Sequence, residues 1–261
     1  MITAASNSRI KRLVQLNQKS KLRRTEDVFL AEGVKMFLEA PRKQLQEVYV
    51  SESFLEKCSC REHLEEVGYE VVSDSVFSKI SDTCTPQGVL CVLKQFHYNI
   101  EEMLRDKAPL FLLLENIQDP GNLGTMLRTG EGAGVSGIIM SRDTVDLYNP
   151  KVIRSTMGSI YRVPFYYADD FAAAVHQVQQ AGVSVYAAHL RGKNSYACQD
   201  YTKGTAFLIG NEGNGLREET AELADCYIRI PMEGKVESLN AAVASSILMY
   251  EAHRQRETIE K

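Results

Sequence analysis

Apolar and polar positions alternate along the 261-residue chain in two different spacings. Near the start, Ile10, Leu13 and Leu16 fall on one side of a helix that Ser8 could cap. Short apolar runs then alternate with helical segments as far as Gln95. The pattern predicts strands at 28–31, 48–50, 69–72 and 88–93, and helices at 34–39, 53–66 and 75–80. Such an order favours a small α/β domain.

A more polar stretch over residues 94–109, with a predicted helix at 99–107, separates this region from a more regular one. We expect strands at 110–114, 137–140, 163–166, 183–187, 205–209 and 226–230, helices between them, and a long final helix at 239–256. This order predicts a second α/β domain with a mostly parallel sheet. We therefore place one domain at 1–98, a linker at 99–108 and the other domain at 109–261.

Composition is that of an ordinary globular protein, with 44% hydrophobic and 25% charged residues. The most apolar run, Leu110–Leu114, is far shorter than the about 20 residues that a membrane helix needs. Residues 1–11 also lack the apolar run of a signal peptide. We expect a cytoplasmic protein with no membrane partner.

Cysteine and histidine positions do not suggest metal binding. Among the six cysteines only Cys58 and Cys60 lie close together, and C-x-C matches neither the zinc nor the thioredoxin spacing. The five histidines are scattered along the chain. We expect no metal ion, and unpaired thiols in a reducing compartment.

Charge is distributed unevenly, although the net value is only −4. Residues 1–24 hold seven basic side chains and no acidic one, which leaves 23 basic and 34 acidic residues in the rest of the chain. The basic residues of this leader are Arg9, Lys11, Arg12, Lys19, Lys21, Arg23 and Arg24. The asymmetry fits a surface that faces phosphates, and it also fits a solvated helix face.

Three turns in the second domain are rich in glycine and asparagine. The first, residues 115–124, follows an apolar strand and opens a helix near Asn122, whose free amides would point into the crevice beyond the strand. The second, residues 208–216, holds three glycines within six residues, which favours a ligand loop over a plain turn. The third, residues 230–244, leads into the last helix, with Ser238 or a neighbour as N-cap.

Residues 132–137 match the dinucleotide pattern G-x-G-x-x-G. The match follows a helix and precedes a strand, the reverse of the order that the motif requires. We interpret it as a helix C-cap and turn.

Taken in order, the three turns resemble the signature motifs of the SpoU/TrmH family of RNA methyltransferases, in the SPOUT superfamily. The first motif is matched by Asn116, Asn122, Gly124, Arg128 and Thr129. The second is matched by Ile209, Gly210, Glu212, Gly215 and Leu216. The third is matched by Ile230, Pro231, Met232, Gly234, Ser238, Leu239 and Asn240. Residues 29–33, 81–83 and 85–88 resemble the ribosomal-protein-like substrate-binding domain often fused ahead of this catalytic domain.

The resemblance implies a C-terminal domain with a deep trefoil knot, a homodimer with its active site at the subunit interface, and S-adenosylmethionine as cofactor. The implied cofactor-binding residues are Gly210, Ile230, Leu239, Asn211, Glu212, Gly215 and Met232. The implied RNA-binding residues are Arg9, Lys11, Arg12, Lys21, Arg23, Arg24 and Arg128.

The implied reaction is methyl transfer to a ribose 2′-hydroxyl, most readily of large-subunit ribosomal RNA. We expect Arg128 to grip a phosphate and polarise the hydroxyl, with Asn116, Ser238 and Asn240 orienting it. Glu212 is either a base or a cap for the backbone amides of its own loop. Alternatives are a transfer RNA 2′-O-methyltransferase, a base methyltransferase of the superfamily, and a non-catalytic RNA-binding protein on the same scaffold.

Overall fold

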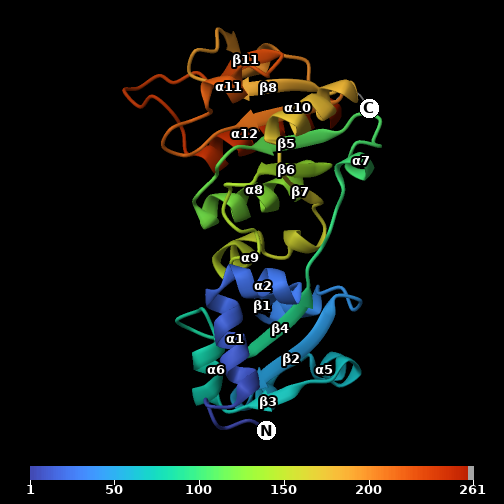
Figure 1. The fold of residues 1–261 in the computed structure, drawn as a ribbon, viewed down its shortest axis with the longest axis vertical. Helices are drawn as coiled ribbons and strands as arrows, with labels where there is room; N and C mark the ends of the chain where they lie inside the picture. Colours follow the sequence, from blue (N-terminus) through green and yellow to red (C-terminus); the bar gives the residue numbers. More distant parts are fainter. Residues whose placement is uncertain (258–261) are drawn as a thin grey trace. The chain divides into compact units, whose positions relative to one another are not determined.

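The computed structural model describes residues 1–257, which form two compact units (Figure 1). Unit 1 consists of Met1–Phe96 together with Asp146–Tyr161. Unit 2 consists of His97–Val145 and the described chain from Arg162 onward. A short stretch from within the predicted second domain is thus built into unit 1. Among residues 1–257, no helix combines the length and the apolar composition needed to span a bilayer.

Unit 1 contains a four-stranded mixed sheet in the order β1-β4-β2-β3, as described for residues 1–257. Its strands are β1 (Val28–Glu32), β2 (Leu45–Ser51), β3 (Glu70–Val72) and β4 (Val89–Lys94). Strand β4 runs antiparallel to both of its neighbours, and β2 and β3 are parallel. Its helices are α1 (Ser8–Gln18), α2 (Ser20–Glu26), α3 (Val34–Leu38), α4 (Glu52–Lys57), α5 (Arg61–Val67), α6 (Asp74–Ile80), α9 (Pro150–Thr156) and the 3-10 turn η1 (Ser159–Tyr161).

Helix α1 buries the predicted apolar side, with Ile10, Leu13 and Leu16 at most 1% exposed in one cluster with residues of α6. Its N-cap is Asn7, whose side chain accepts the amide hydrogen of Arg9, so the expected cap at Ser8 is wrong by one residue. The single helix expected over 53–66 is also wrong. It is broken into α4 and α5, because Cys58 adopts an extended backbone and ends the first piece.

Unit 2 is built on a seven-stranded sheet, as described for residues 1–257, in the order β7-β6-β5-β10-β8-β11-β9. Its strands are β5 (Leu110–Leu114), β6 (Gly137–Ser141), β7 (Phe165–Ala168), β8 (Ser184–Ala188), β9 (Asn194–Ser195), β10 (Thr205–Ile209) and β11 (Cys226–Arg229). Every pairing among them is parallel. Its helices are α7 (Ile100–Met103), α8 (Pro120–Ala133), α10 (Phe171–Gln180), α11 (Glu218–Ala221), α12 (Ala241–Glu257) and the 3-10 turn η2 (Tyr196–Cys198).

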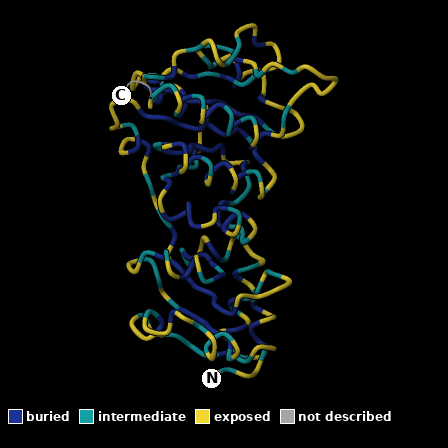
Figure 2. The backbone as a smooth tube through the Cα atoms, turned by 180° about the vertical axis from the view of Figure 1, so that it is seen from behind, coloured by how far each residue is buried: buried dark blue, intermediate teal, exposed yellow. Residues whose placement is uncertain are grey.

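The central strands of this sheet are covered on both faces. Strands β5, β6 and β10 are buried at every position, which explains their continuous apolar runs (Figure 2). The prediction of an α/β fold with a parallel sheet is therefore confirmed. Strand β9, which was not expected, is an edge strand of only two residues that pairs with β11, and it is too short to leave a periodic signal.

The glycine pattern at 132–137 lies where α8 ends. Gly134 is the C-cap of that helix, in the left-handed conformation with φ +75°, and its amide closes the helix by bonding to carbonyls of Gly130 and Glu131. The interpretation as a C-cap and turn is confirmed.

Candidate functional site

A cavity of about 270 Å³ opens in unit 2 beyond the carboxyl ends of β8, β10 and β11. In parallel α/β sheets this edge is where ligands bind. Its wall includes all seven residues expected to bind the cofactor: Gly210, Ile230, Leu239, Asn211, Glu212, Gly215 and Met232. Ser238 also lines it, whereas Asn116, Arg128 and Asn240 are not among its lining residues. The fold thus gathers the second and third glycine-rich turns around one space.

The loop after β10 closes tightly on itself. Asn211 and Gly215 exchange two backbone hydrogen bonds, of 3.0 and 2.9 Å, and Gly215 has φ +69°. A Cβ at Gly210 would lie 2.2 Å from the carbonyl carbon of Gly215 and 2.2 Å from the amide nitrogen of Leu216. Only glycine fits at position 210, because backbone rather than a movable side chain fills the space.

Glu212 joins this loop to the loop that follows β5. Its carboxylate accepts hydrogen bonds from the amides of Gln118 and Asp119, at 3.1 and 2.9 Å, and from the side chain of Asn122 at 3.0 Å. Of the two roles considered for Glu212, capping is what the structure shows. The capped amides of Gln118 and Asp119 belong to the first glycine-rich turn, so the cap reaches beyond the loop that the sequence suggested.

The same contacts keep Glu212 ionised. Burial raises the pKa of its carboxyl, but the hydrogen bonds from Asn122, Asp119 and Gln118 outweigh burial, so the pKa lies below its ordinary value. A carboxylate with a lowered pKa and three such donors around it is a poor proton acceptor for a ribose hydroxyl.

Replacing Glu212 with glutamine is expected to lower stability by about 1 kcal/mol at neutral pH, since charged hydrogen bonds are lost at a partly exposed site. Because the folded pKa is lowered, the contribution of Glu212 is present above the ordinary glutamate pKa and is lost as pH falls through the folded pKa. Urea unfolding from pH 7 to pH 3 measures it. Glu219→Gln, at an exposed carboxylate of α11, is the control. A difference from wild type that persists unchanged at pH 3 would contradict this assignment.

Asn240 ties the third turn to the first. Its side-chain oxygen caps α12 by accepting the amides of Ala242 and Val243, at 2.9 and 3.3 Å. Its side-chain nitrogen donates to the side-chain oxygen of Asn122 at 3.0 Å. The expected cap at Ser238 or a neighbour is therefore Asn240, and a chain of contacts from Glu212 through Asn122 to Asn240 connects all three turns.

Asn116, two residues after the end of β5, sits in the left-handed region with φ +54°. Its amide donates to the hydroxyl of Ser141 at 2.8 Å, and its carbonyl accepts from the side chain of Asn211 at 2.8 Å. These contacts and its backbone conformation fix Asn116 between the ends of β6 and β10.

Further residues around Asn116, which were not expected from the sequence, support its position. Ser141 and Arg217 both donate to the carboxylate of Asp143. The Glu115 carboxylate is 2% exposed and accepts the Arg217 amide at 2.8 Å. Burial raises the pKa of Asp143, but the hydrogen bonds from Ser141 and Arg217 outweigh it, so the pKa is lowered. A weak signal was present, since Glu115 and Ser141 stand at the ends of apolar strands.

Arg128 lies on the second half of α8 and is exposed. Within residues 1–257 its guanidinium has no hydrogen-bond or ion-pair partner, in contrast to most other arginines of this chain. Gly124, one turn earlier on the same helix, is buried, whereas Arg128 is exposed.

His189 also lines the cavity and was not expected there. It follows the end of β8, and its ring packs on Tyr227 with ring centroids 5.1 Å apart. Burial and the nearby charge of Arg191 lower the pKa of His189, so it is neutral at physiological pH. Its place just after a parallel strand was the signal that could have found it.

The basic leader is only partly available to a ligand. Arg9 pairs with Glu70 at 2.7 Å, and Arg12 contacts Glu26 and Glu47 at 2.7 and 2.9 Å. Within residues 1–24 the exposed cations for which the described chain shows no ion pair are Lys11, Lys19, Lys21 and Arg24.

Arg23 is a correction to the expected RNA-binding set. Its side chain is 3% exposed, bonds to the carbonyl of Leu16 at 2.6 Å and pairs with Asp146 at 2.5 Å. A guanidinium buried in this way holds unit 1 together and is not free to meet a phosphate.

Comparison with known proteins decides the family. Residues 109–250, more than half of the chain, match the model of the SpoU rRNA Methylase family. This protein belongs to the SpoU rRNA methylase family. Residues 7–91 match the MRM3-like substrate binding domain. The resemblance expected from the three motifs is thereby confirmed.

Relatives of the SpoU protein include Bacillus subtilis (strain 168) 23S rRNA (guanosine(2553)-2′-O)-methyltransferase RlmP, 32% identical over 252 residues, 95% of this chain and 97% of RlmP. An AdoMet-bound rRNA methyltransferase from Sinorhizobium meliloti is 31% identical with a TM-score of 0.84, covering 97% of each chain. The SpoU methyltransferase AviRb of Streptomyces viridochromogenes, in complex with AdoMet, is 26% identical with a TM-score of 0.87, covering 97% of this chain and 99% of that one.

Proposed function

We propose that this SpoU protein transfers a methyl group from S-adenosylmethionine to a ribose 2′-hydroxyl of large-subunit ribosomal RNA, acting in the cytoplasm, where that RNA resides. The observation that carries the proposal is the cavity beyond β8, β10 and β11, lined by the second and third SpoU motifs and connected to the first through Glu212 and Asn122. The names of RlmP and of the AdoMet-bound structures support the substrate and the cofactor.

The cavity suits an adenosyl group. The side chains of Ile230, Met232 and Leu239 give it apolar walls, and the backbone of the 210–216 loop, bare of a side chain at Gly210, gives close polar contact. We therefore assign cofactor binding to Gly210, Ile230, Leu239, Asn211, Glu212, Gly215 and Met232. When bound, S-adenosylmethionine supplies a methyl group on a sulfonium, from which a neutral thioether is an excellent leaving group.

The residues of this chain then have to orient the ribose and lower the cost of removing its proton. We assign the orienting to Arg128, whose guanidinium fork, engaged by no group of residues 1–257, can donate to a phosphate and to the hydroxyl oxygen, while the hydroxyl proton leaves to solvent water as the methyl group is transferred. Ser238, on the cavity wall, and Asn116 and Asn240, held by the contacts between the turns, orient the nucleotide.

We also propose a homodimer whose active site is completed at the subunit interface. Arg128 is exposed and lies outside the cavity wall of its own chain, which supports its acting on a site that a second chain completes. Val243 and Tyr250, each 48% exposed on α12, offer an apolar face for that contact. The proposal includes a deep trefoil knot in the C-terminal domain. It also assigns residues 1–98 to the RNA substrate-binding domain, 99–108 to the linker and 109–261 to the methyltransferase domain.

The test is methyl transfer from radiolabelled S-adenosylmethionine to unmodified 23S ribosomal RNA, 16S ribosomal RNA and transfer RNA in parallel. We expect label in 23S RNA, at a linkage that resists alkaline cleavage because the 2′-oxygen is blocked. Label at an alkali-sensitive linkage would indicate a base methyltransferase. Label only in transfer RNA would replace the proposed substrate, and the absence of label in every RNA would contradict the activity.

A further inference from the structure

A second cavity, of about 450 Å³, lies within unit 1. Three segments line it: the junction of β1 and α3, the loop between α6 and β4, and helix α9 with the residue that ends it. The first two belong to the N-terminal range, whereas α9 comes from the range that matches the methylase model. The cavity is therefore built from two distant parts of the sequence, although it lies inside one compact unit.

The loop that forms one side of this cavity is held at both ends. The Glu32 carboxylate accepts the hydroxyl hydrogen bonds of Ser81 and Thr83, at 2.8 and 3.0 Å. At the other end, the Gln87 side-chain oxygen accepts the amide of Val34 at 3.0 Å. Gly33 has φ +114°, and a Cβ there would lie 2.9 Å from that same oxygen. The rim is thus built in advance of any ligand.

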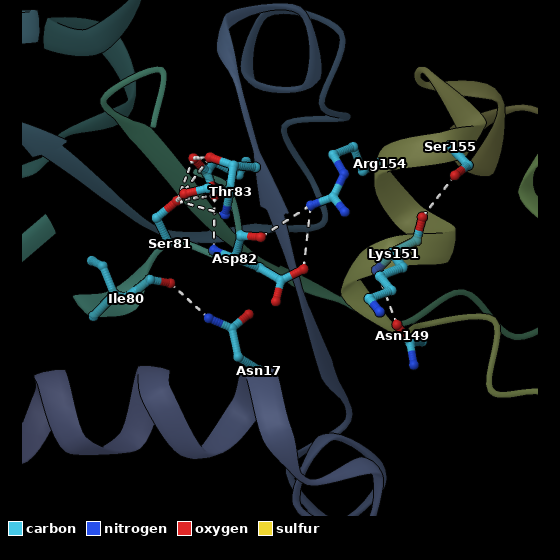
Figure 3. Close-up of polar contacts among 10 residues, drawn as sticks. Asn17, Ile80, Ser81, Asp82, Thr83, Asn149, Lys151, Arg154 and Ser155 are labelled. Carbon is cyan, nitrogen blue, oxygen red and sulfur yellow. Dashed lines mark hydrogen bonds and ion pairs between the residues drawn. The ribbon is translucent and has the colours of Figure 1, made fainter. Parts of the chain in front are cut away.

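Helix α9 reaches across to this loop. The Arg154 guanidinium donates to the carboxylate and to the carbonyl of Asp82, at 3.2 and 3.3 Å (Figure 3). The cavity wall holds two carboxylates, those of Asp82 and Glu32. The pair with Arg154 offsets the charge of Asp82, and Glu32 already accepts hydrogen bonds from Ser81 and Thr83. Lys35, also in the wall, keeps a side chain that is 53% exposed and makes only a long 3.7 Å contact to Glu39. Lys151, exposed one turn before Arg154, adds a further cation on α9.

The cavity also offers an apolar surface. Met157 is 41% exposed and is held in the left-handed conformation, φ +52°, where it ends α9. A flexible thioether in this position can cover the flat face of a ring. Hydroxyl and amide groups of Thr83, Thr85 and Gln87 stand in the same wall. Two carboxylates disfavour a bare phosphate, while an apolar face, polar edges and cations at the rim match a whole nucleotide.

We propose that this cavity binds one unpaired nucleotide of the substrate RNA, with Met157 covering the base, Lys35 meeting an adjoining phosphate, and Arg154 holding the Asp82 loop in place. Proteins read RNA sequence mainly from bases that have left the stack. Three cations of the basic leader are engaged within unit 1, because Arg23 is buried and Arg9 and Arg12 are paired, and its four exposed cations can add phosphate contacts beside those of this cavity. The inference rests on the proposed function for the identity of the RNA, and it makes α9 part of the RNA-binding surface.

Two variants of the full chain separate the two kinds of contact. Lys35→Ala removes a phosphate contact. Met157→Asn removes the apolar cover while keeping a residue that tolerates the left-handed conformation. The control is Lys43→Ala, at an exposed lysine of unit 1 that does not line the cavity. The probe is an unmodified 23S ribosomal RNA transcript, with filter binding measured over a series of KCl concentrations.

For Lys35→Ala we expect weaker binding and a slope of log affinity against log salt that is smaller by about 1. For Met157→Asn we expect about tenfold weaker binding with the slope unchanged, as for the loss of one base contact. Lys43→Ala should bind as wild type does. Circular dichroism confirms that each variant is folded.

If both cavity variants bind the transcript as tightly as Lys43→Ala, or if wild type does not bind it, the inference is overturned. Calorimetric binding of S-adenosylmethionine and methyl incorporation, measured on the same proteins, report separately on the proposed function. Loss of those two signals with the affinity differences intact would overturn the proposed activity and leave this nucleotide site standing.

Discussion

Replacing Arg128 with alanine is expected to lower methyl transfer to RNA by about 100-fold to 1,000-fold, the range for the loss of one positioned hydrogen-bond donor at a reacting centre. The cause is the loss of the one guanidinium in the three motifs that no group of residues 1–257 engages. Binding of S-adenosylmethionine should not change, because Arg128 does not line the cavity. Single-turnover methylation and calorimetry measure the two quantities separately.

Arg128→Lys is the sharper control for the proposed role. It keeps the charge and loses the planar fork, so we expect activity well below wild type. Near-full activity in the lysine variant would show that charge alone is enough. Loss of cofactor affinity in the alanine variant would instead place Arg128 in the cofactor site.

Replacing Gly210 with valine is expected to reduce cofactor affinity at least 100-fold and to abolish methyl transfer. A branched side chain would have to displace the Gly215–Leu216 peptide, which a Cβ at 210 already meets at 2.2 Å. Calorimetric titration with S-adenosylmethionine measures the loss, and thermal unfolding shows whether the sheet of unit 2 remains intact.

The matched control is Gly213→Ala in the same loop. At this position the nearest atom to a Cβ is the Asn211 side-chain oxygen at 3.6 Å, an ordinary contact, and φ is not positive. We expect cofactor affinity within a few-fold of wild type. Equal losses at positions 210 and 213 would mean that loop flexibility, and not the close backbone contact, determines binding.

Mixing the Arg128→Ala and Gly210→Val proteins then examines the proposed dimer. If Arg128 of one chain serves the cavity of the other, each mixed dimer contains one site with both groups intact, and part of the activity returns. If both groups act within one chain, no intact site forms and no activity returns, which would contradict the proposed interface arrangement.

Much of unit 2 follows from local sequence. Strands β5 and β10 have the predicted bounds, Leu110–Leu114 and Thr205–Ile209, since strands buried on both faces leave continuous apolar runs. The three glycines of the 210–216 loop predict that another group approaches the backbone of this loop closely, because few other reasons place three glycines there. Their joint position around one cavity follows from the parallel order of β8, β10 and β11.

The tertiary structure decided the features that depend on contacts between residues far apart in the sequence. A 94-residue separation lies between Glu212 and the Gln118 amide that it caps, so no local pattern could name that partner. The burial of Arg23 depends on Asp146, which is 123 residues away. Likewise, α9 packs against β1 in unit 1 although its neighbours in sequence build unit 2.

The sequence by itself therefore determined the fold class, the family and the residues around the cavity, because hydrophobic period, turn chemistry and motif spacing are local properties. The tertiary structure decided that Glu212 caps amides of the first turn, that Arg23 is buried and paired within unit 1, and that α9 completes a second cavity. Each of these depends on burial and on partners brought together by folding, and identical residue types at identical spacing carry different roles when those partners change.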